Sequence, residues 1–231
     1  LLLNEFDGGE KNKNALTLFK KAYLEVSQNK QKIAKYQYSY QSNVNTGVLL
    51  ESDSNGDGTI ARPADTHGFG YFPGHFGMAL LSKFPIDNKA IRTFQLFKWK
   101  DMPNALMPIN PDTNKPWYTD NTWNELRLSS KSHWDIPVSV NGKPVHVLAS
   151  HPTPPVFDGP EDRNGKRNHD ELRFWADYIS QGKSSYIYDD LGKKGGITSN
   201  VPFVFLGDLN ASTTDGDAIT EGIASITQHS N

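Results

Sequence analysis

The order of apolar and polar positions along the chain predicts short strands with helices between them. The clearest strand covers 201–206, a run of mostly apolar residues rich in β-branched and aromatic types. Residues 132–140 alternate, Asn141-Gly142 follows, and 144–150 returns, which is the pattern of a β-hairpin with a tight turn. Further strands are predicted at 1–3, 36–40, 48–50 and 77–82.

Helical spacing of apolar residues predicts two amphipathic helices. The first covers 12–28 and has a lysine-rich outer face. The second begins at Asn168, and Asn168 with Glu171 three residues later resembles a capping box. Long irregular segments lie between the strands and helices, and loops of such length inside a domain are usually functional. They cover 52–76, 101–124 and 152–167.

Composition narrows the class of protein. The 231 residues show no internal repeat, low-complexity tract or domain boundary, so a single domain over 1–231 is predicted. No apolar run is long enough to span a bilayer. The absence of cysteine excludes disulfides, a thiolate nucleophile and zinc–cysteine sites. A net charge of −2 argues against a protein that grips polyanions through bulk charge, and it leaves small phosphorylated substrates open.

Polar residues of one chemical kind stand at the ends of four predicted strands. Glu5 follows 1–3, His75 precedes 77–82, His151 follows 144–150, and Asp208 and Asn210 follow 201–206. Carboxylates and amides are hard oxygen ligands that suit Mg²⁺ or Mn²⁺. A carboxylate can also orient an attacking water, and an imidazole can supply a proton or a hydrogen bond. Together these residues indicate metal-assisted hydrolysis of a phosphate ester.

The motifs run through the chain in a fixed order: Leu3-Asn4-Glu5, then 77–83, then Ser150-His151-Pro152, then Gly207-Asp208-Leu209-Asn210. This order resembles the endonuclease/exonuclease/phosphatase superfamily, and the runs at 68–74 and 168–173 resemble an uncharacterised bacterial subgroup of it. The resemblance implies an α/β (α+β) fold, a four-layer sandwich of two packed mixed β-sheets flanked by helices, as in deoxyribonuclease I. It places the site between the sheets.

The resemblance also implies roles for individual residues. Glu5 would hold Mg²⁺ or Mn²⁺, and His151 would contact the scissile phosphate or act as general acid. Asp208 would orient the nucleophilic water, and Asn210 would bind the phosphate in the transition state. The family's first strand would precede Leu1, and its closing Asp-His pair has no match here. The chain is therefore expected to be an interior portion of a longer protein.

Each candidate residue has a simpler explanation beside the catalytic one. Glu5 could be a solvated charge at a strand end, and His151 could open a rigid loop, since Pro152 follows it. His75 is more typical of a loop residue, although it could face the cleft and bind substrate. Arg167 could be a solvated cation, or it could bind the phosphate of the substrate.

The segment 53–60 carries a separate signal. Asp53, Asn55 and Asp57 with Gly58 match the first half of an EF-hand calcium loop, but the twelfth position is Ala64 instead of glutamate. The alternatives are a Ca²⁺ site that stiffens the loop and an ordinary Asp/Asn/Gly turn. Weak calcium loops suit extracellular calcium levels, which slightly favours a secreted or periplasmic protein.

Three functions remain open. The expected one is a monomeric, divalent-metal-dependent phosphoesterase acting on a small phosphorylated substrate. The second is a calcium-stabilised binding domain that keeps the fold with impaired catalysis, which the missing Asp-His pair would suit. The third is a nuclease acting on DNA, which the lack of a basic stripe interleaved with aromatic residues disfavours.

Overall fold

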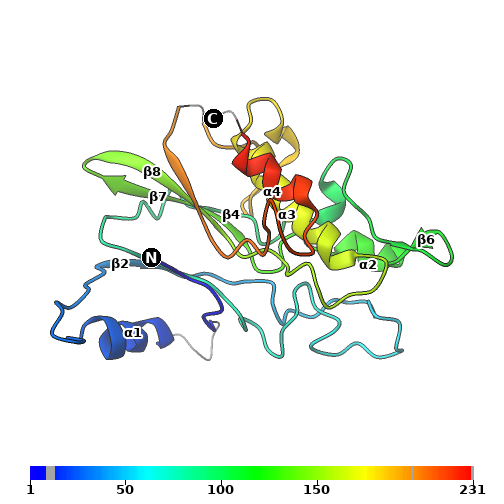
Figure 1. Cartoon of the computed structure of the whole chain (residues 1–231), viewed down its shortest axis with the longest axis horizontal. Helices are drawn as coiled ribbons and strands as arrows, with labels where there is room; N and C mark the ends of the chain where they lie inside the picture. Colours follow the sequence, from blue (N-terminus) through cyan, green and yellow to red (C-terminus); the bar gives the residue numbers. More distant parts are fainter. Residues whose placement is uncertain (9–13, 199, 230–231) are drawn as a thin grey trace.

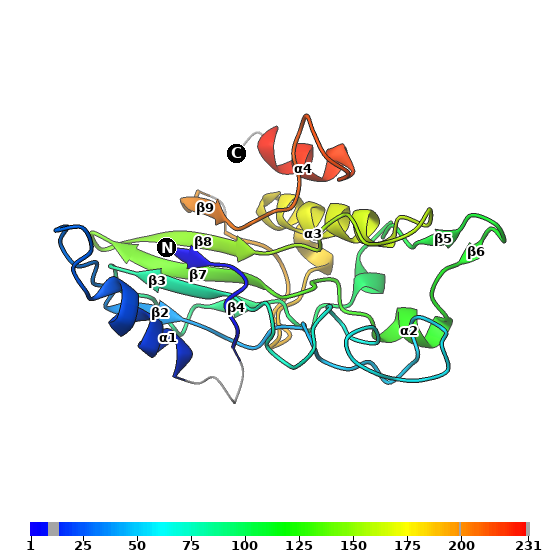
Figure 2. The ribbon, with the colours of Figure 1, turned by 60° about the horizontal axis from the view of Figure 1, so that its bottom comes forward.

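Two β-sheets pack face to face at the centre of the molecule (Figure 2). The computed structural model describes residues 1–8, 14–198 and 200–229. The first sheet has the order β1 (Leu2–Leu3), β3 (Ala79–Ser82), β2 (Tyr38–Tyr40), and both pairs are antiparallel. The second has the order β4 (Arg92–Thr93), β7 (His133–Val140), β8 (Lys143–Ser150), β9 (Phe203–Leu206). It is mixed, because β9 runs parallel to β8 while the other pairs are antiparallel.

Apolar side chains of both sheets meet in one core. Leu80 of β3 and Met78, which directly precedes β3, pack against the second sheet. Their partners there are Trp134, Ile136 and Ala149, and all five residues are buried. The strands supply this core because alternate residues point to the same face of a sheet. The two sheets therefore form the inner layers of the fold.

Helices cover the outer face of each sheet (Figures 1 and 2). On the second sheet, α3 (Arg163–Ile179) buries Phe174 and Trp175 over Leu148, and α4 (Thr220–Thr227) packs on α3. On the first sheet, α1 (Ala15–Phe19) continues as the π-helix η2 (Lys20–Leu24), and its Leu16 packs on Ala79 and Leu81. The predicted four-layer sandwich is confirmed. No helix in the described ranges is long and apolar enough to cross a lipid bilayer.

Short elements depart from the sequence-based expectation. The segment 101–124, expected to be irregular, contains the hairpin β5 (Ile109–Asn110) and β6 (Lys115–Pro116) and the start of α2 (Asp120–Glu125). Two 3₁₀ helices, η3 (Trp99–Asp101) and η4 (Ser184–Tyr186), complete the elements. The predicted strand 48–50 is wrong, because its only ladder contact is an isolated bridge between Leu49 and Thr66. The strands β5 and β6 and the 3₁₀ helices have only two or three residues each, which is too short for a periodic pattern to predict them.

The second helix begins earlier than its pattern indicates. It starts at Arg163 instead of Asn168, so Asn168 and Glu171 lie inside it and are fully buried. The capping-box interpretation is therefore wrong. The side chains of Asn168 and Glu171 hydrogen-bond to the backbone of neighbouring loops and do not cap the helix. The first helix covers 15–24 of the predicted 12–28, and residues 12–13 lie outside the described part.

Two glycine-containing positions shape the two ends of the second sheet. The hairpin is confirmed, with positive φ at Asn141 (52°) and Gly142 (77°), as a two-residue type I′ turn requires. At the other end, a Cβ on Gly207 would lie 2.0 Å from the carbonyl oxygen of Ser150. Only glycine lets the ends of β8 and β9 approach so closely. His151 and Asp208, the next residues of each strand, are therefore brought side by side.

We expect Gly207→Ala to lower the free energy of unfolding by about 1–3 kcal/mol, because its methyl group would push the two strand ends apart. Urea unfolding followed by circular dichroism measures the change. Val204→Ala, at an exposed position of the same strand, is the matched control and should shift stability by no more than about 0.5 kcal/mol. Equal stability of the two variants would contradict the close approach.

Candidate active site

The predicted residues His151, Asp208 and Asn210 lie together where β8 and β9 end. The backbone N–H of Asn210 donates to Oδ1 of Asp208 at 3.0 Å, and its side-chain amide donates to the carbonyl of Pro152 at 3.1 Å. Asn210 has φ 50°, a left-handed conformation that asparagine tolerates. The loop after β9 is thus tied to the loop after β8, and the side chains of both loops share one corner of the sheet.

A buried lysine that the sequence reading missed connects this corner to the amino-terminal strand. Lys131 precedes β7, and its charge interacts most strongly with the carboxylate of Glu171 and also with those of Glu5 and Asp208. Burial lowers the pKa of Lys131 to about 8, and the neighbouring acids oppose that change. Glu5 and Asp208 are 203 positions apart in the sequence (208 minus 5), yet they act on the same ammonium group. Lys131 is therefore the electrostatic centre of the candidate site.

His151 is buried next to this lysine. Burial and, to a smaller extent, the charge of Lys131 lower the pKa of His151 to about 4, while the charge of Asp208 acts in the opposite direction. The imidazole is therefore neutral at pH 7 before any substrate binds. Among the described residues, its Nδ1 is one of the few buried side-chain atoms without a hydrogen-bond partner. A neutral ring with an unused nitrogen is suited to accept or donate one hydrogen bond to a ligand.

Glu171 of α3 joins the loops on which these groups stand. Its carboxylate is fully buried and accepts the backbone N–H of Ser130 at 2.7 Å and of Thr153 at 2.6 Å. It also interacts with the charge of Lys131. Asn168, one turn earlier on the helix, donates to the carbonyls of Thr153 and Leu209. The helix therefore holds three loops of the site in place.

Glu5 lies at the tip beyond β1, on the opposite side of the corner. It is exposed and has φ 54°, and the next residues are held because Phe6 donates to the Gly77 carbonyl at 2.9 Å. Next to it, Oδ1 of Asn4 is buried and has no hydrogen-bond partner among the described residues. An exposed carboxylate beside an unused amide oxygen is a donor set that suits a hard divalent cation.

The described residues contain no group of three or more His, Asp or Glu side chains that could enclose a metal ion. Mg²⁺ keeps several waters and takes only one or two carboxylates, so a site for it needs no such group. The exposed carboxylate of Glu5 fits such a cation. No further ligand follows from the geometry.

The two residues predicted to bind substrate lie in different surroundings. Arg167 is buried in α3, and its guanidinium donates to the carbonyls of Leu128, His67 and Arg127, so it supports the loops behind the site. His75 is partly exposed in the loop that precedes β3, and the centroid of its ring lies 3.5 Å from that of Phe76. Substrate binding by His75 stays a prediction, while Arg167 supports the loops of the site from within.

The predicted calcium loop is an exposed turn closed by its own side chains. Asp53 accepts the backbone N–H of Gly56 and of Gly58, each at 2.7 Å, and Asn55 and Asp57 hydrogen-bond to each other. The first and fifth positions of the loop thus already face its interior. Calcium binding by Asp53, Asn55 and Asp57 stays a prediction.

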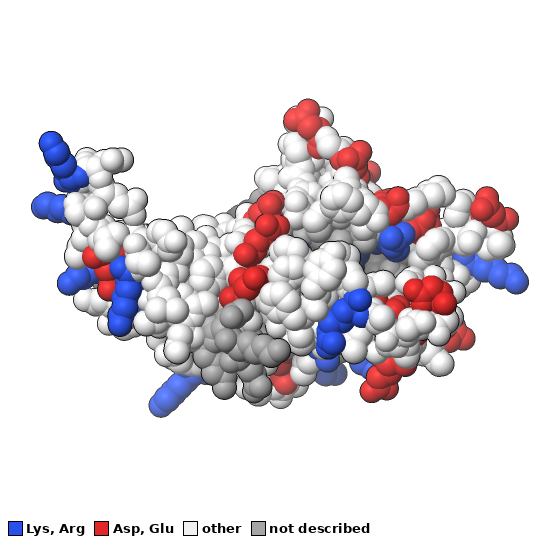
Figure 3. Space-filling view, turned by 90° about the horizontal axis from the view of Figure 1, so that it is seen from below, with Lys and Arg blue, Asp and Glu red and all other residues white. Residues whose placement is uncertain are grey.

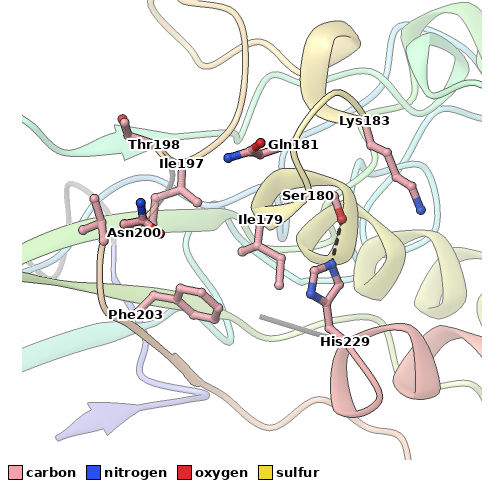
Figure 4. A pocket seen from close by; sticks show the side chains of 10 residues that line it. Ile179, Ser180, Gln181, Lys183, Ile197, Thr198, Asn200, Phe203 and His229 are labelled. Atoms are coloured by element: carbon pink, nitrogen blue, oxygen red, sulfur yellow. Dashed lines mark hydrogen bonds between the residues drawn. The ribbon is translucent and has the colours of Figure 1, made fainter.

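A pocket lies away from these residues (Figure 4). It has a volume of about 620 Å³ and lies between the end of α3 and the segment that leads to β9. The hydroxyl of Ser180 and Nε2 of His229 lie 2.7 Å apart at its edge, and Phe203 and Ile179 form the apolar wall. None of the predicted site residues lines it, so the pocket does not mark the candidate site.

Charge is unevenly spread over the molecule. On the face drawn in Figure 3, acidic side chains form a short band near the middle and gather again over the right-hand part, while basic side chains lie in scattered groups at the left-hand end and in the right half. Such a pattern differs from the continuous basic stripe of proteins that follow a nucleic acid backbone.

The fold is an α/β sandwich of two packed sheets with polar groups at the strand ends. Comparison with known protein families identifies the family of this chain. A model of the Endonuclease/Exonuclease/phosphatase family matches residues 1–222. The chain belongs to this family. No curated protein matches the chain.

Solved structures of similar proteins include a beta toxin from Staphylococcus aureus, which is 17% identical with a TM-score of 0.44 and is matched over 96% of this chain and 56% of that one. Sphingomyelinase C from Streptomyces griseocarneus is also 17% identical, with a TM-score of 0.46 over 97% of this chain and 55% of that chain. A double mutant of the beta toxin with bound magnesium ions has a TM-score of 0.45 at 17% identity, over 96% and 55% of the two chains. The chain spans a little over half the length of these proteins.

We expect stability to fall as the pH is lowered from 7 to 5. Burial and nearby Arg127 lower the pKa of His67 to about 3, and the pKa of His151 is about 4, both below the ordinary value of 6.5. Between pH 6.5 and 4 the unfolded chain therefore binds more protons than the folded one, so acid favours unfolding. Urea midpoints at pH 7, 6 and 5 measure the slope. His67→Gln should flatten it, and a midpoint that is constant over this range would contradict the burial of neutral histidines.

Proposed function

We propose that this chain is the catalytic part of a divalent-metal-dependent hydrolase that cleaves a phosphate ester by in-line attack of water. The observation that carries the proposal is the meeting of the ends of β8 and β9, where Gly207 lies against the Ser150 carbonyl and the side-chain amide of Asn210 donates to the Pro152 carbonyl. The buried ammonium of Lys131, whose charge interacts with Glu171, Glu5 and Asp208, favours binding of an anion such as a phosphate beside these residues. Membership of the family supports the same chemistry.

Each side chain receives a role from its position. Glu5 would hold Mg²⁺ or Mn²⁺, and a bound cation of this kind would polarise the phosphate and stabilise its developing charge. Asp208 accepts a proton from the attacking water or orients it, because its carboxylate is fixed by the backbone of Asn210. Lys131 donates to a phosphate oxygen and balances its charge.

His151 and Asn210 complete the contacts to the phosphate. Because the pKa of His151 is about 4, the ring reaches the phosphate as a neutral imidazole, and its N–H donates a hydrogen bond to a phosphate oxygen. This favours the phosphate-contact role of His151 over that of a general acid. Asn210 uses one amide hydrogen on Pro152 and keeps the other for the ligand.

The acidic band and the net charge of −2 favour a small ester over a polymeric nucleic acid. Both monoesters and diesters fit the arrangement. The substrate class in this proposal is therefore a small phosphorylated molecule.

We expect Asp208→Ala and His151→Ala each to lower kcat by at least about 10²-fold, since each removes a proton-transfer or phosphate contact. A panel of phosphate esters assayed by phosphate or alcohol release, with Mg²⁺, Mn²⁺ or excess chelator, provides the measurement. Asp87→Ala, on an exposed turn far along the chain from the site, is the control. Activity that survives both site variants, or persists in chelator, would refute the assignment.

Lys131 gives a separate prediction with its own pH signature. Lys131→Met should lower kcat/KM by about tenfold or more, because a charge-assisted bond to the phosphate is lost. Since the ammonium is charged below its pKa of about 8, wild-type activity should decline as the pH rises through 8. Lys131→Arg should keep part of the activity and lose that decline. Lys143→Met, at an exposed position of β8, is the control, and full activity of Lys131→Met would overturn the role.

A further inference from the structure

The loop 68–77 holds a row of aromatic rings beside the candidate site. Its sequence is Gly-Phe-Gly-Tyr-Phe-Pro-Gly-His-Phe-Gly, with no lysine, arginine or acid. Ring centroids of neighbours in the row lie 3.5 to 5.8 Å apart, from Phe76 through His75 to Tyr71 and Phe69, and Phe72 lies 4.6 Å from His75. The outer rings remain open to solvent, with exposed fractions of 57% for Phe69, 62% for Tyr71 and 39% for Phe72.

Both ends of this loop are attached to the site. At its start, a Cβ on Gly68 would lie 2.0 Å from the carbonyl of Ser130, the residue before Lys131. At its end, Phe76 donates to the carboxylate of Asp7 at 2.9 Å, and Gly77 accepts from Phe6, the residue after Glu5. The loop that carries the aromatic row therefore runs from the backbone beside Lys131 to the backbone beside Glu5.

The middle of the loop is held rigidly as well. Gly74 donates to Thr46 at 3.1 Å and Gly47 donates to the Gly68 carbonyl at 2.8 Å, and a Cβ on Gly47 would lie 2.0 Å from the carbonyl of Phe72. Phe76 has φ 54°, a strained conformation for a bulky residue that the hydrogen bond to Asp7 maintains. Keeping large aromatic rings exposed to water is unfavourable in free energy, because their burial would be stabilising. Exposed apolar patches of this kind commonly bind a ligand.

We infer that this loop is a stacking platform, and that the ester cleaved at the site carries a flat ring in its alcohol portion that packs on Tyr71 and its neighbours. The inference rests on the proposed function and adds the substrate class. A flat ring stacks on aromatic side chains in offset or edge-to-face geometry, and a Tyr hydroxyl and an imidazole tolerate water around such a ring. An anionic membrane surface fits less well, because the loop has no basic residue and Glu5 and Asp7 lie at its end.

The test compares esters that differ only in the ring. The full chain with Mg²⁺ is assayed on benzyl phosphate against ethyl phosphate, and on dibenzyl phosphate against diethyl phosphate. Tyr71→Ala should raise KM for the benzyl esters about tenfold, the loss typical of one ring–aromatic stack, with kcat little changed and the ethyl esters unaffected. Tyr71→Phe should keep the preference. Tyr23→Ala, at a tyrosine of η2 with a similar exposed fraction of 60%, should change nothing.

A binding measurement separates this inference from the proposed function. Calorimetric titration with benzylphosphonate and ethylphosphonate needs no catalysis, and wild-type protein should bind the benzyl compound more tightly by about tenfold, a difference that Tyr71→Ala removes. If the wild type hydrolyses no ester but shows this difference, the platform stands and the hydrolase assignment fails. Equal losses on benzyl and ethyl compounds, or none on either, would overturn the platform. The platform would also be overturned if Tyr71→Ala lost binding to phosphatidylcholine vesicles and kept the preference for benzyl over ethyl compounds, since the loop would then contact lipid.

Discussion

The site depends on one buried carboxylate. Glu171 is fully enclosed between α3 and the second sheet, where an unpaired charge would be strongly unfavourable. It is tolerated because two backbone N–H groups, from Ser130 and Thr153, donate to it and the charges of Lys131 and Arg167 lie near it. The same contacts fix the loop before β7 to the loop after β8. The helix thus positions catalytic loops through an interaction that also satisfies its own charge.

The second constraint is the close contact of two parallel strand ends. Gly207 allows the end of β9 to lie against the carbonyl of Ser150, and the next residues, Asp208 and His151, inherit that proximity. The first sheet contributes Glu5, which follows the edge strand β1 and whose charge interacts with Lys131. A charged group from each sheet therefore acts on one ammonium between them.

Much of this arrangement was readable in the chain. The alternation of 132–140 and 144–150 around Asn141-Gly142 required a hairpin, and the apolar run at 201–206 required a buried strand, because each pattern has few alternatives. The motifs around Glu5, His151 and Asp208 indicated the family. Short elements such as the β5–β6 hairpin and α4 were missed, since a few residues of mixed polarity carry no period.

Local sequence thus determined the strands, the main helices and the kinds of functional group this protein carries, because periodicity and turn chemistry act between near neighbours. Only the tertiary structure decided which polar residues are buried. The sequence predicts Glu171 as part of a helix cap and Arg167 as a solvated cation or a phosphate-binding residue, whereas packing buries both of them and Lys131 as well. Burial and charge pairing arise between residues far apart in the chain, and for that reason no local pattern records them.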